Sequence, residues 1–414
     1  MRVLEVGTLR LQECAEPASR EDSEYAILSH TWSTDEVLPE DLEARNLEAT
    51  THKAGYAKIY HASEQAALSG CKYLWADTCC IDKKSSAELQ EIINSMYRYY
   101  ALARVCYVHL DDVTAGPGWE GQVRRSRWFT RAWTLQELVA PVDVQFFDRS
   151  WTLLGHLQDL LGLVASITTI PVSLLKHKRI PTTYSIAQRM SWAAGRQASR
   201  VEDIAYSLLG IFDVNLTMLY GEGNKAFTRL QEEIMRISTD HSIFTWWRDD
   251  DDGNAGPRGV LASSPAAFSG CGTIGRLSGL LPGAFQLTNR GLEIPLPVAE
   301  DPEYGPEAQR TLALLDCYRS GTCEKPYFAL ELCALPKLLN PKHARIDPTL
   351  FTGHVTDAYL VSGLRLLSTA EFQTCSAGHA AQKISLFSGR EIRTMDLFAP
   401  GQPWMAPAAR YTRG

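Results

Sequence analysis

Short apolar runs alternate with helical patterns over the first 150 residues of the chain. The runs are 25–29, 73–77, 105–110 and 142–147, and the first is apolar up to Ser29, which is typical of a strand covered on both faces. Between them, apolar residues recur at helical spacing over 53–68 and 87–103. The alternation predicts a mostly parallel sheet with right-handed crossovers, preceded by a hairpin that turns at Gly7.

The stretch from Ser126 to Pro141 contains no internal glycine or proline, and we expect one helix that Ser126 caps and Pro141 ends. Trp133 and Glu137 are four residues apart, so on such a helix they project from the same face. A carboxylate beside an indole is partly desolvated, which raises its pKa and makes it useful in catalysis. The alternative is an ordinary amphipathic helix, with Glu137 paired to an arginine such as Arg131 at the surface.

Polar and reactive residues follow the predicted strands. In open parallel sheets, ligands bind outside the carboxyl ends of the strands, near the point where the strand order reverses. The residues at those ends are Ser29, His30, Asp77, Cys79 and Asp111. Their clustering favours a functional site at this edge of the sheet.

The remainder of the chain divides into three parts. Residues 151–248 read as a helical extension of the α/β core, so that 1–248 form one domain with the core at about 1–150. An acidic, glycine-containing linker follows at 249–257. Residues 258–414 carry short alternating runs separated by Gly, Pro and Asn, which predict a smaller antiparallel β domain.

Composition narrows the function classes. A chain of 414 residues suggests two or three domains, and a net charge of -7 argues against a nucleic-acid or anionic-membrane binder. Glu5 interrupts the apolar start, so we expect no signal peptide, and no apolar window is long enough to span a membrane. The ten cysteines form no CxxC pair, which favours reduced, buried thiols in a cytoplasmic protein without a structural metal.

Several long motifs in consistent order resemble the HET (heterokaryon incompatibility) domain proteins of filamentous fungi. The resemblance covers about residues 20–247. It is carried by Tyr25–Trp32 (YAILSHTW), Leu74–Asp82 (LWADTCCID), Ser95–Tyr97 (SMY), Trp128–Pro141 (WFTRAWTLQELVAP), Ala187–Ala194 (AQRMSWAA), Glu202–Asp213 (EDIAYSLLGIFD) and Leu219–Gly223 (LYGEG). One departure is Ala132, which stands where the family usually has glycine.

The family is linked to non-self recognition and programmed cell death, and its domain is distantly similar to TIR domains. Some TIR domains are enzymes that cleave NAD at the nicotinamide–ribose bond. The resemblance therefore implies a TIR/flavodoxin-like sheet flanked by helices, with NAD as a substrate and no cofactor or metal.

Roles for individual residues follow from that resemblance. Glu137 is the carboxylate expected to stabilise the positive charge that develops on the ribose. Trp32 or Trp133 would stack on a ring, and Asp77 or His30 would position the sugar. Further candidate substrate-binding residues are Ser29, Arg131 and Asp111.

Other readings stay open. A small-molecule enzyme of a biosynthetic pathway could use the same cleft for acid–base chemistry, with Asp77, Cys79, His30 and Glu137 converging on an apolar pocket. Cys79 could act as a nucleophile with His30 as its base. A non-catalytic signalling module that oligomerises and acts through death-signalling partners is the third reading.

Overall fold

In the computed structural model the described residues are 1–43, 50–247, 260–277, 284–288, 291–300, 311–321, 327–334, 358–367 and 381–386. They pack into two compact units. The first comprises Met1–Thr183 and Gly195–Leu230, and the second comprises Tyr184–Ala194 and Gln231–Gly414. Residues 184–194 and 231–247, which we expected in the helical extension, are thus grouped with the second unit. The predicted linker at 249–257 lies outside the described residues.

The first unit is built on a seven-stranded sheet in the order β2-β1-β4-β3-β5-β6-β7. Its strands are β1 (Arg2–Glu5), β2 (Leu11–Glu13), β3 (Tyr25–His30), β4 (Tyr73–Ala76), β5 (Val105–His109), β6 (Val144–Phe147) and β7 (Leu153–His156). The four strands predicted from the apolar runs, β3 to β6, are present and parallel. Because β1, β2 and β7 pair antiparallel at the two edges, the sheet is mixed rather than mostly parallel.

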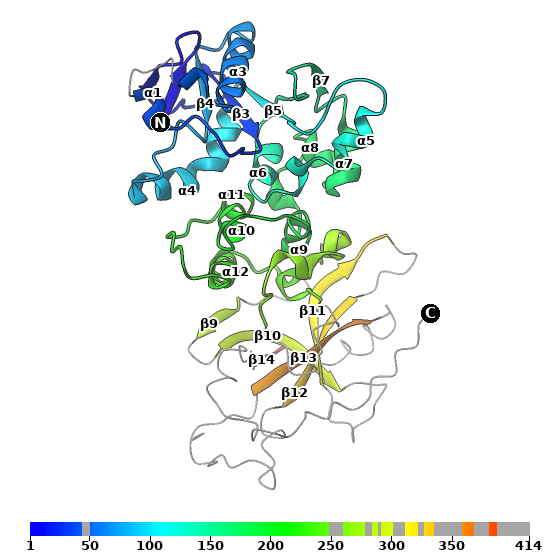
Figure 1. Ribbon diagram of the computed structural model, residues 1–414. Coiled ribbons are helices and arrows are strands. Elements are labelled where there is room, and N and C mark those ends of the chain that lie inside the picture. Colours follow the sequence, from blue (N-terminus) through cyan, green and yellow to red (C-terminus); the bar gives the residue numbers. More distant parts are fainter. Residues whose placement is uncertain are drawn as a thin grey trace, which may run out of the picture. The chain divides into compact units, whose positions relative to one another are not determined.

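Two sets of helices cover opposite faces of this sheet. Helix α3 (Tyr56–Leu68) lies on one face, and α4 (Ser86–Leu102) and α6 (Thr134–Val139) lie on the other (Figure 1). The predicted helices at 53–68 and 87–103 are therefore confirmed. The apolar side of α4 is buried through Ile92, Ile93, Met96 and Tyr100.

Shorter helices complete the first unit. They are α1 (Pro39–Glu43), α5 (Trp119–Val123), η1 (Arg127–Thr130), α7 (Leu161–Thr168), α8 (Val172–Leu175), η2 (Pro181–Thr183), α10 (Asp203–Tyr206) and α11 (Leu209–Phe212). Helix α12 (Lys225–Ile237) contains the boundary between the units at Leu230 and Gln231.

The second unit combines short helices with a second seven-stranded sheet in the order β8-β11-β12-β13-β14-β10-β9. The helices are α9 (Ile186–Ser191), η3 (His241–Phe244), η5 (Pro265–Phe268) and η6 (Cys271–Thr273). The strands are β8 (Ile274–Arg276), β9 (Gln286–Thr288), β10 (Gly291–Glu300), β11 (Thr311–Arg319), β12 (Tyr327–Ala334), β13 (Ala358–Leu367) and β14 (Ala381–Leu386).

Pairing in this second sheet is antiparallel except between β13 and β14. Strand β10 pairs with both β11 and β14, so β10 to β14 form a closed ring of strands. Leu312 and Leu314 of β11 and Ala329 of β12 belong to its apolar core. The smaller, antiparallel β-rich part predicted from the sequence is thus present.

None of the helices in the described ranges is long and apolar enough to cross a membrane.

Candidate functional site

The segment from Ser126 to Ala140 forms two short helices, not one. Ser126 caps η1, as predicted, but Arg131 is extended (φ -79°, ψ 140°) and α6 begins only at Thr134. The cause is a distant partner, because Arg131 forms a parallel bridge with Gln197. The prediction of a single helix is therefore wrong: tertiary hydrogen bonds override the local helix propensity.

Glu137 lies at the centre of a buried chain of hydrogen bonds. The indole N–H of Trp128 donates to Ser29 Oγ (2.8 Å), and the Ser29 hydroxyl donates to Glu137 Oε2 (2.5 Å). The Glu137 side chain is only 4% exposed. Of the candidate residues, the structure thus brings together Ser29 from the end of β3 and Glu137 from α6, and it adds Trp128 from η1.

The environment of Glu137 raises the pKa of its carboxyl from 4.5 to about 7. Burial is the largest cause, because it disfavours the charged form, and the negative charge of Asp77 adds to it. The Ser29 hydrogen bond, the positive charge of Arg131 and a hydrogen bond from Tyr100 act in the opposite direction. Near neutral pH both protonation states of Glu137 are therefore populated, which suits an acid or base.

Asp77 forms the solvent-facing neighbour of Glu137. It follows β4, and its Oδ2 accepts a hydrogen bond of 2.9 Å from the indole N–H of Trp32. Trp32 is 38% exposed, and the Lys83 ammonium lies 3.5 Å from the centroid of its ring, in cation–π contact. Asp77 and Trp32 thus lie together at the strand ends, with Lys83 as an addition.

His30 is separated from this cluster. Side chains alternate along a strand, so that the residue after Ser29 projects from the opposite face of the sheet. There His30 Nε2 lies 3.7 Å from Glu36 Oε2, and Glu36 Oε1 accepts a hydrogen bond from the Lys58 ammonium of α3. The structure does not bring His30 to Glu137.

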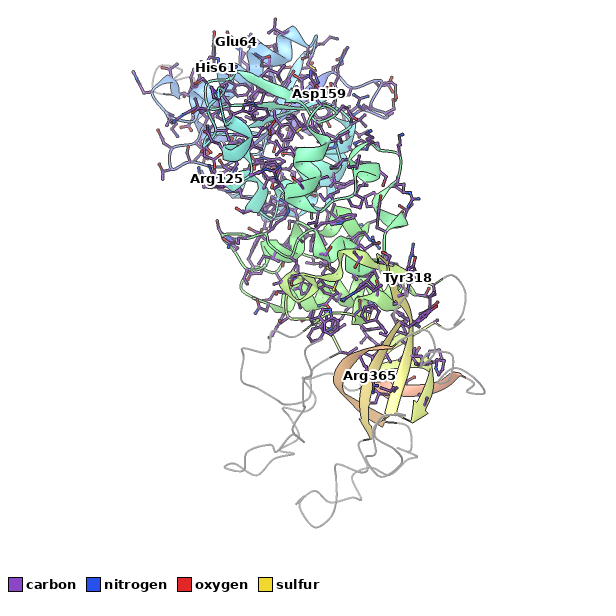
Figure 2. The ribbon with its side chains drawn as sticks, turned by 90° about the vertical axis from the view of Figure 1, so that its right-hand side faces the viewer. His61, Glu64, Arg125, Asp159, Tyr318 and Arg365 are labelled. Carbon is purple, nitrogen blue, oxygen red and sulfur yellow. The ribbon has the colours of Figure 1, made fainter. Side chains whose placement is uncertain are left out.

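Stacked aromatic rings lie near the group formed by His30, Glu36 and Lys58. His30 is paired with His109 in the register of β3 and β5. The imidazole of His109 stacks on Trp151 at 4.9 Å, and burial lowers its pKa to about 4. On the outer side of α3, His61 Nδ1 and Glu64 Oε2 lie 2.9 Å apart and both side chains are exposed (Figure 2).

Trp133 has a different partner from the one expected. It precedes α6 as its N-cap, and its side chain is hydrogen-bonded to Asp203, near the start of α10. The indole that contacts the Ser29–Glu137 pair belongs to Trp128, which lies five residues earlier. Because Trp133 is itself helical (φ -62°, ψ -35°), it still precedes Glu137 by about one turn, but the hydrogen bond to Ser29 comes from Trp128.

Cys79 and Asp111 have structural partners. The Cys79 side chain is fully buried, and a hydrogen bond with Cys80, together with burial, raises the pKa of its thiol well above the usual value. A protonated, enclosed thiol is a poor nucleophile. Asp111 forms an ion pair of 2.7 Å with Arg127.

Arg196 is buried beside this site and was not singled out by the sequence. Its Nη1 donates to the carbonyl oxygen of Arg131 (2.9 Å) and to Thr134 Oγ1 (2.8 Å). Burial lowers the pKa of its guanidinium to about 10, and the negative charge of Glu137 acts against that shift. No local pattern around residue 196 signals this role.

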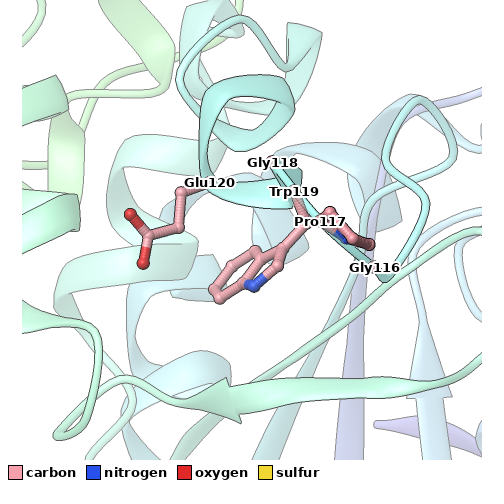
Figure 3. A pocket seen from close by; sticks show the side chains of 5 residues that line it. All are labelled: Gly116, Pro117, Gly118, Trp119 and Glu120. Carbon is pink, nitrogen blue, oxygen red and sulfur yellow. The ribbon is translucent and has the colours of Figure 1, made fainter.

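An open hollow of about 480 Å³ lies elsewhere on the first unit. It is lined by the loop and helix start at Gly116, Pro117, Gly118, Trp119 and Glu120 (Figure 3). None of the predicted site residues lines it. Within the described ranges, no group of three or more His, Cys, Asp or Glu side chains is arranged to hold a metal ion.

Comparisons with known proteins match both units. Residues 25–118 match the family model of the heterokaryon incompatibility protein (HET), and residues 225–259 match a domain of unknown function (DUF8212). The chain is 45% identical over 220 residues to the vegetative incompatibility protein HET-E-1 of Podospora anserina. That match covers 51% of this chain but only 16% of the relative's length. No solved structure matches the chain.

Proposed function

This chain is a HET (heterokaryon incompatibility) domain protein of the fungal kind, and on that premise we propose that it is a cytoplasmic effector of cell death in non-self recognition, which cleaves NAD at the nicotinamide–ribose bond. Glu137 is the reacting carboxyl group in this proposal. Asp77 and Trp32 form the side from which the substrate approaches.

The observation that carries the proposal is the raised pKa and the fixed orientation of the Glu137 carboxyl. Its pKa of about 7 arises from burial and from Asp77, and it is held in one orientation by Ser29. Residues with strongly shifted pKa values cluster at functional sites. If Glu137 had only a structural role, a direct ion pair with Arg131 or Arg196 would stabilise the fold more than the observed hydrogen bond from Ser29 close to the charge of Asp77.

The chemistry needs one carboxylate. When the bond between nicotinamide and ribose breaks, nicotinamide leaves as a neutral molecule and the ribose carbon takes on positive charge. A carboxylate at that position stabilises this charge, and water then attacks the carbon to give ADP-ribose and release a proton. In the proposal Glu137 supplies the carboxylate and Asp77 holds the ribose hydroxyls.

The strand order supports the location. The four parallel strands follow the order β4-β3-β5-β6, so the connections reverse direction at β3. The same order occurs in flavodoxin-like sheets, where ligands bind at the carboxyl ends of the strands beside the reversal. Ser29 and Asp77 stand at that edge.

A second candidate is a non-catalytic signalling module that acts through oligomers or partners. The observation that favours it is that Glu137 is only 4% exposed. The catalytic proposal requires substrate to reach this buried carboxyl, whereas a module needs no such access. The third reading, a biosynthetic enzyme, required His30 and Glu137 to converge, and they lie on opposite faces of the sheet.

The test is a turnover assay with purified protein and NAD, in which nicotinamide release is measured from pH 5.5 to 8.5. Because the carboxylate is the active form, we expect the rate to rise with pH through about 7. Glu137→Gln should abolish release and Asp77→Asn should reduce it. Glu64→Gln, which alters an exposed carboxylate on α3, is the matched control.

Two outcomes decide between the candidates. Release that disappears in folded Glu137→Gln but persists in Glu64→Gln supports the NAD-cleaving function. An absence of release at high protein concentration, with a folded chain, overturns it and leaves the signalling module.

A further inference from the structure

A short strap formed by Arg196 and Gln197 holds the start of α6. The Gln197 N–H donates to the Thr130 carbonyl oxygen (2.6 Å), and the Ala132 N–H donates to the Gln197 carbonyl oxygen (2.8 Å). These two bonds bracket the extended Arg131 on both sides. They supply partners for backbone groups that a continuous helix would have satisfied internally.

Arg196 secures the same break with its side chain. One guanidinium nitrogen, Nη1, donates both to the Arg131 carbonyl oxygen and to Thr134 Oγ1. The Thr134 hydroxyl in turn lies 2.5 Å from the Trp128 carbonyl oxygen. Arg196 therefore ties the end of η1 to the first residue of α6, and it does so while only 8% exposed.

Glu137 follows three residues after Thr134, within the first turn of α6. Any rotation of that turn would move its carboxyl relative to Ser29 of β3, and the 2.5 Å bond tolerates little movement. The guanidinium also places a fixed positive charge beside a carboxyl that Asp77 makes more difficult to ionise.

We propose that Arg196 is a positioning residue for Glu137: through Arg131 and Thr134 it fixes the orientation of the first turn of α6, and so the place of the Glu137 carboxyl beside Ser29. The expected effect of Arg196 on turnover rests on the proposed function. The expected effect of Arg196 on the Glu137 carboxyl does not depend on any activity.

The experiment is a pH titration of the Glu137 carboxyl carbon by carbon-13 NMR in the full chain, with the signal assigned by its loss in Glu137→Gln. In Arg196→Met we expect the midpoint to rise by up to about one pH unit, because release of the first turn of α6 weakens the Ser29 hydrogen bond that favours the carboxylate form. Arg196→Lys, which keeps an N–H donor, should lie closer to the wild type. Arg189→Met is the matched control, since Arg189 is also buried (5% exposed) but belongs to the second unit.

A second variant guards against loss of folding. Thr134→Val leaves the guanidinium in place and removes the hydroxyl that it bonds. We expect amide hydrogen exchange in α6 to accelerate by about tenfold or more, because the hydroxyl accepts a hydrogen bond from Arg196 and donates one to the Trp128 carbonyl oxygen.

An unchanged midpoint in folded Arg196→Met, or unchanged exchange in Thr134→Val, overturns the positioning role. A raised midpoint in a chain that releases no nicotinamide upholds the positioning role while the proposed function fails. If nicotinamide is released, the rising limb of the pH–rate profile should move upward in Arg196→Met by the same amount as the NMR midpoint.

Discussion

Two buried glutamates on opposite faces of the same sheet have pKa values shifted in opposite directions from the ordinary value. Glu36, on the face covered by α3, is 8% exposed, and Glu137, on the face covered by α6, is 4% exposed. Burial acts to raise the pKa of both carboxyls. Yet the pKa of Glu36 is lowered well below its usual range, whereas that of Glu137 rises to about 7.

The difference lies in the partners. Glu36 accepts hydrogen bonds from the Lys58 ammonium and from the Ser33 N–H (2.5 Å), with His30 close by, so its charge is compensated directly. Glu137 receives a bond from the neutral Ser29 hydroxyl while Asp77 adds a like charge. Burial therefore raises the pKa of a carboxyl in this sheet only where a direct counter-charge is absent.

The largest effect should come from removing the counter-charge of Glu36. Lys58→Met leaves a buried carboxylate without its ammonium, and we expect the free energy of unfolding in urea to fall by about 3–5 kcal/mol. Lys72→Met, which breaks the exposed Lys72–Glu24 pair, is the control and should cost below about 1 kcal/mol. Equal losses of unfolding free energy in the two variants would show that the buried Lys58–Glu36 pair stabilises the fold no more than an exposed pair does.

The next effect concerns pH. The folded-state pKa of Glu137 (about 7) exceeds its ordinary value of 4.5, so the folded chain binds the proton more tightly than the unfolded chain. This term therefore lowers the free energy of unfolding by about 3 kcal/mol as pH rises from 4.5 to above 7. Glu137→Gln should lack the term. Urea unfolding at several pH values measures it, and parallel curves for wild type and variant would refute the raised pKa.

A smaller effect is expected where the loop of Glu36 meets α3. Gly55 precedes α3, and an added Cβ there would lie 2.8 Å from the Cα of Glu36. Gly55→Ala should push this loop away and lower the free energy of unfolding by about 1–3 kcal/mol. Gly162→Ala, in α7 with open space around it, should be neutral or stabilising by about 0.5–1 kcal/mol. Thermal unfolding of both variants compares them, and a stable Gly55→Ala would show that the loop is not fixed.

The smallest effect should come from the hydroxyl of Ser29. Ser29→Ala removes the donor to Glu137 and leaves the Trp128 N–H without its acceptor, which should cost about 1–2 kcal/mol. The pKa of Glu137 should rise further, because the Ser29 bond favours its ionised form. A midpoint that stays at the wild-type value would show that Ser29 does not tune this carboxyl.

Patterns that act within one element were predicted from the sequence. The apolar runs of β3 to β6 and the turn at Gly7, with its φ of 84°, depend on neighbouring residues alone. The position of Ser29 and Asp77 at one edge of the sheet followed from the carboxyl ends of parallel strands meeting there. These features need no knowledge of distant contacts.

Features that depend on distant partners were not predicted. The break at Arg131 is stabilised by Gln197, which is 66 residues later in the chain. Trp128 and Arg196 likewise contact the site only through the folded arrangement: Trp128 begins one of the family motifs without any sign of its partner, and no local pattern marks Arg196. The separation of His30 from Glu137 could have been anticipated, since adjacent residues of a strand face opposite sides.

The adjacency of Ser29 and His30 bears on how the chain avoids misfolding. Slippage of β3 by one residue would move the side chains of each face to the other: Leu28 or His30 would take the place of Ser29 beside Glu137, and Ser29 or Thr31 would take the place of His30 beside Glu36. Both buried carboxyls would then have unsuitable partners at once. The polar end of β3 thus disfavours a shifted strand alignment at both carboxyls at once.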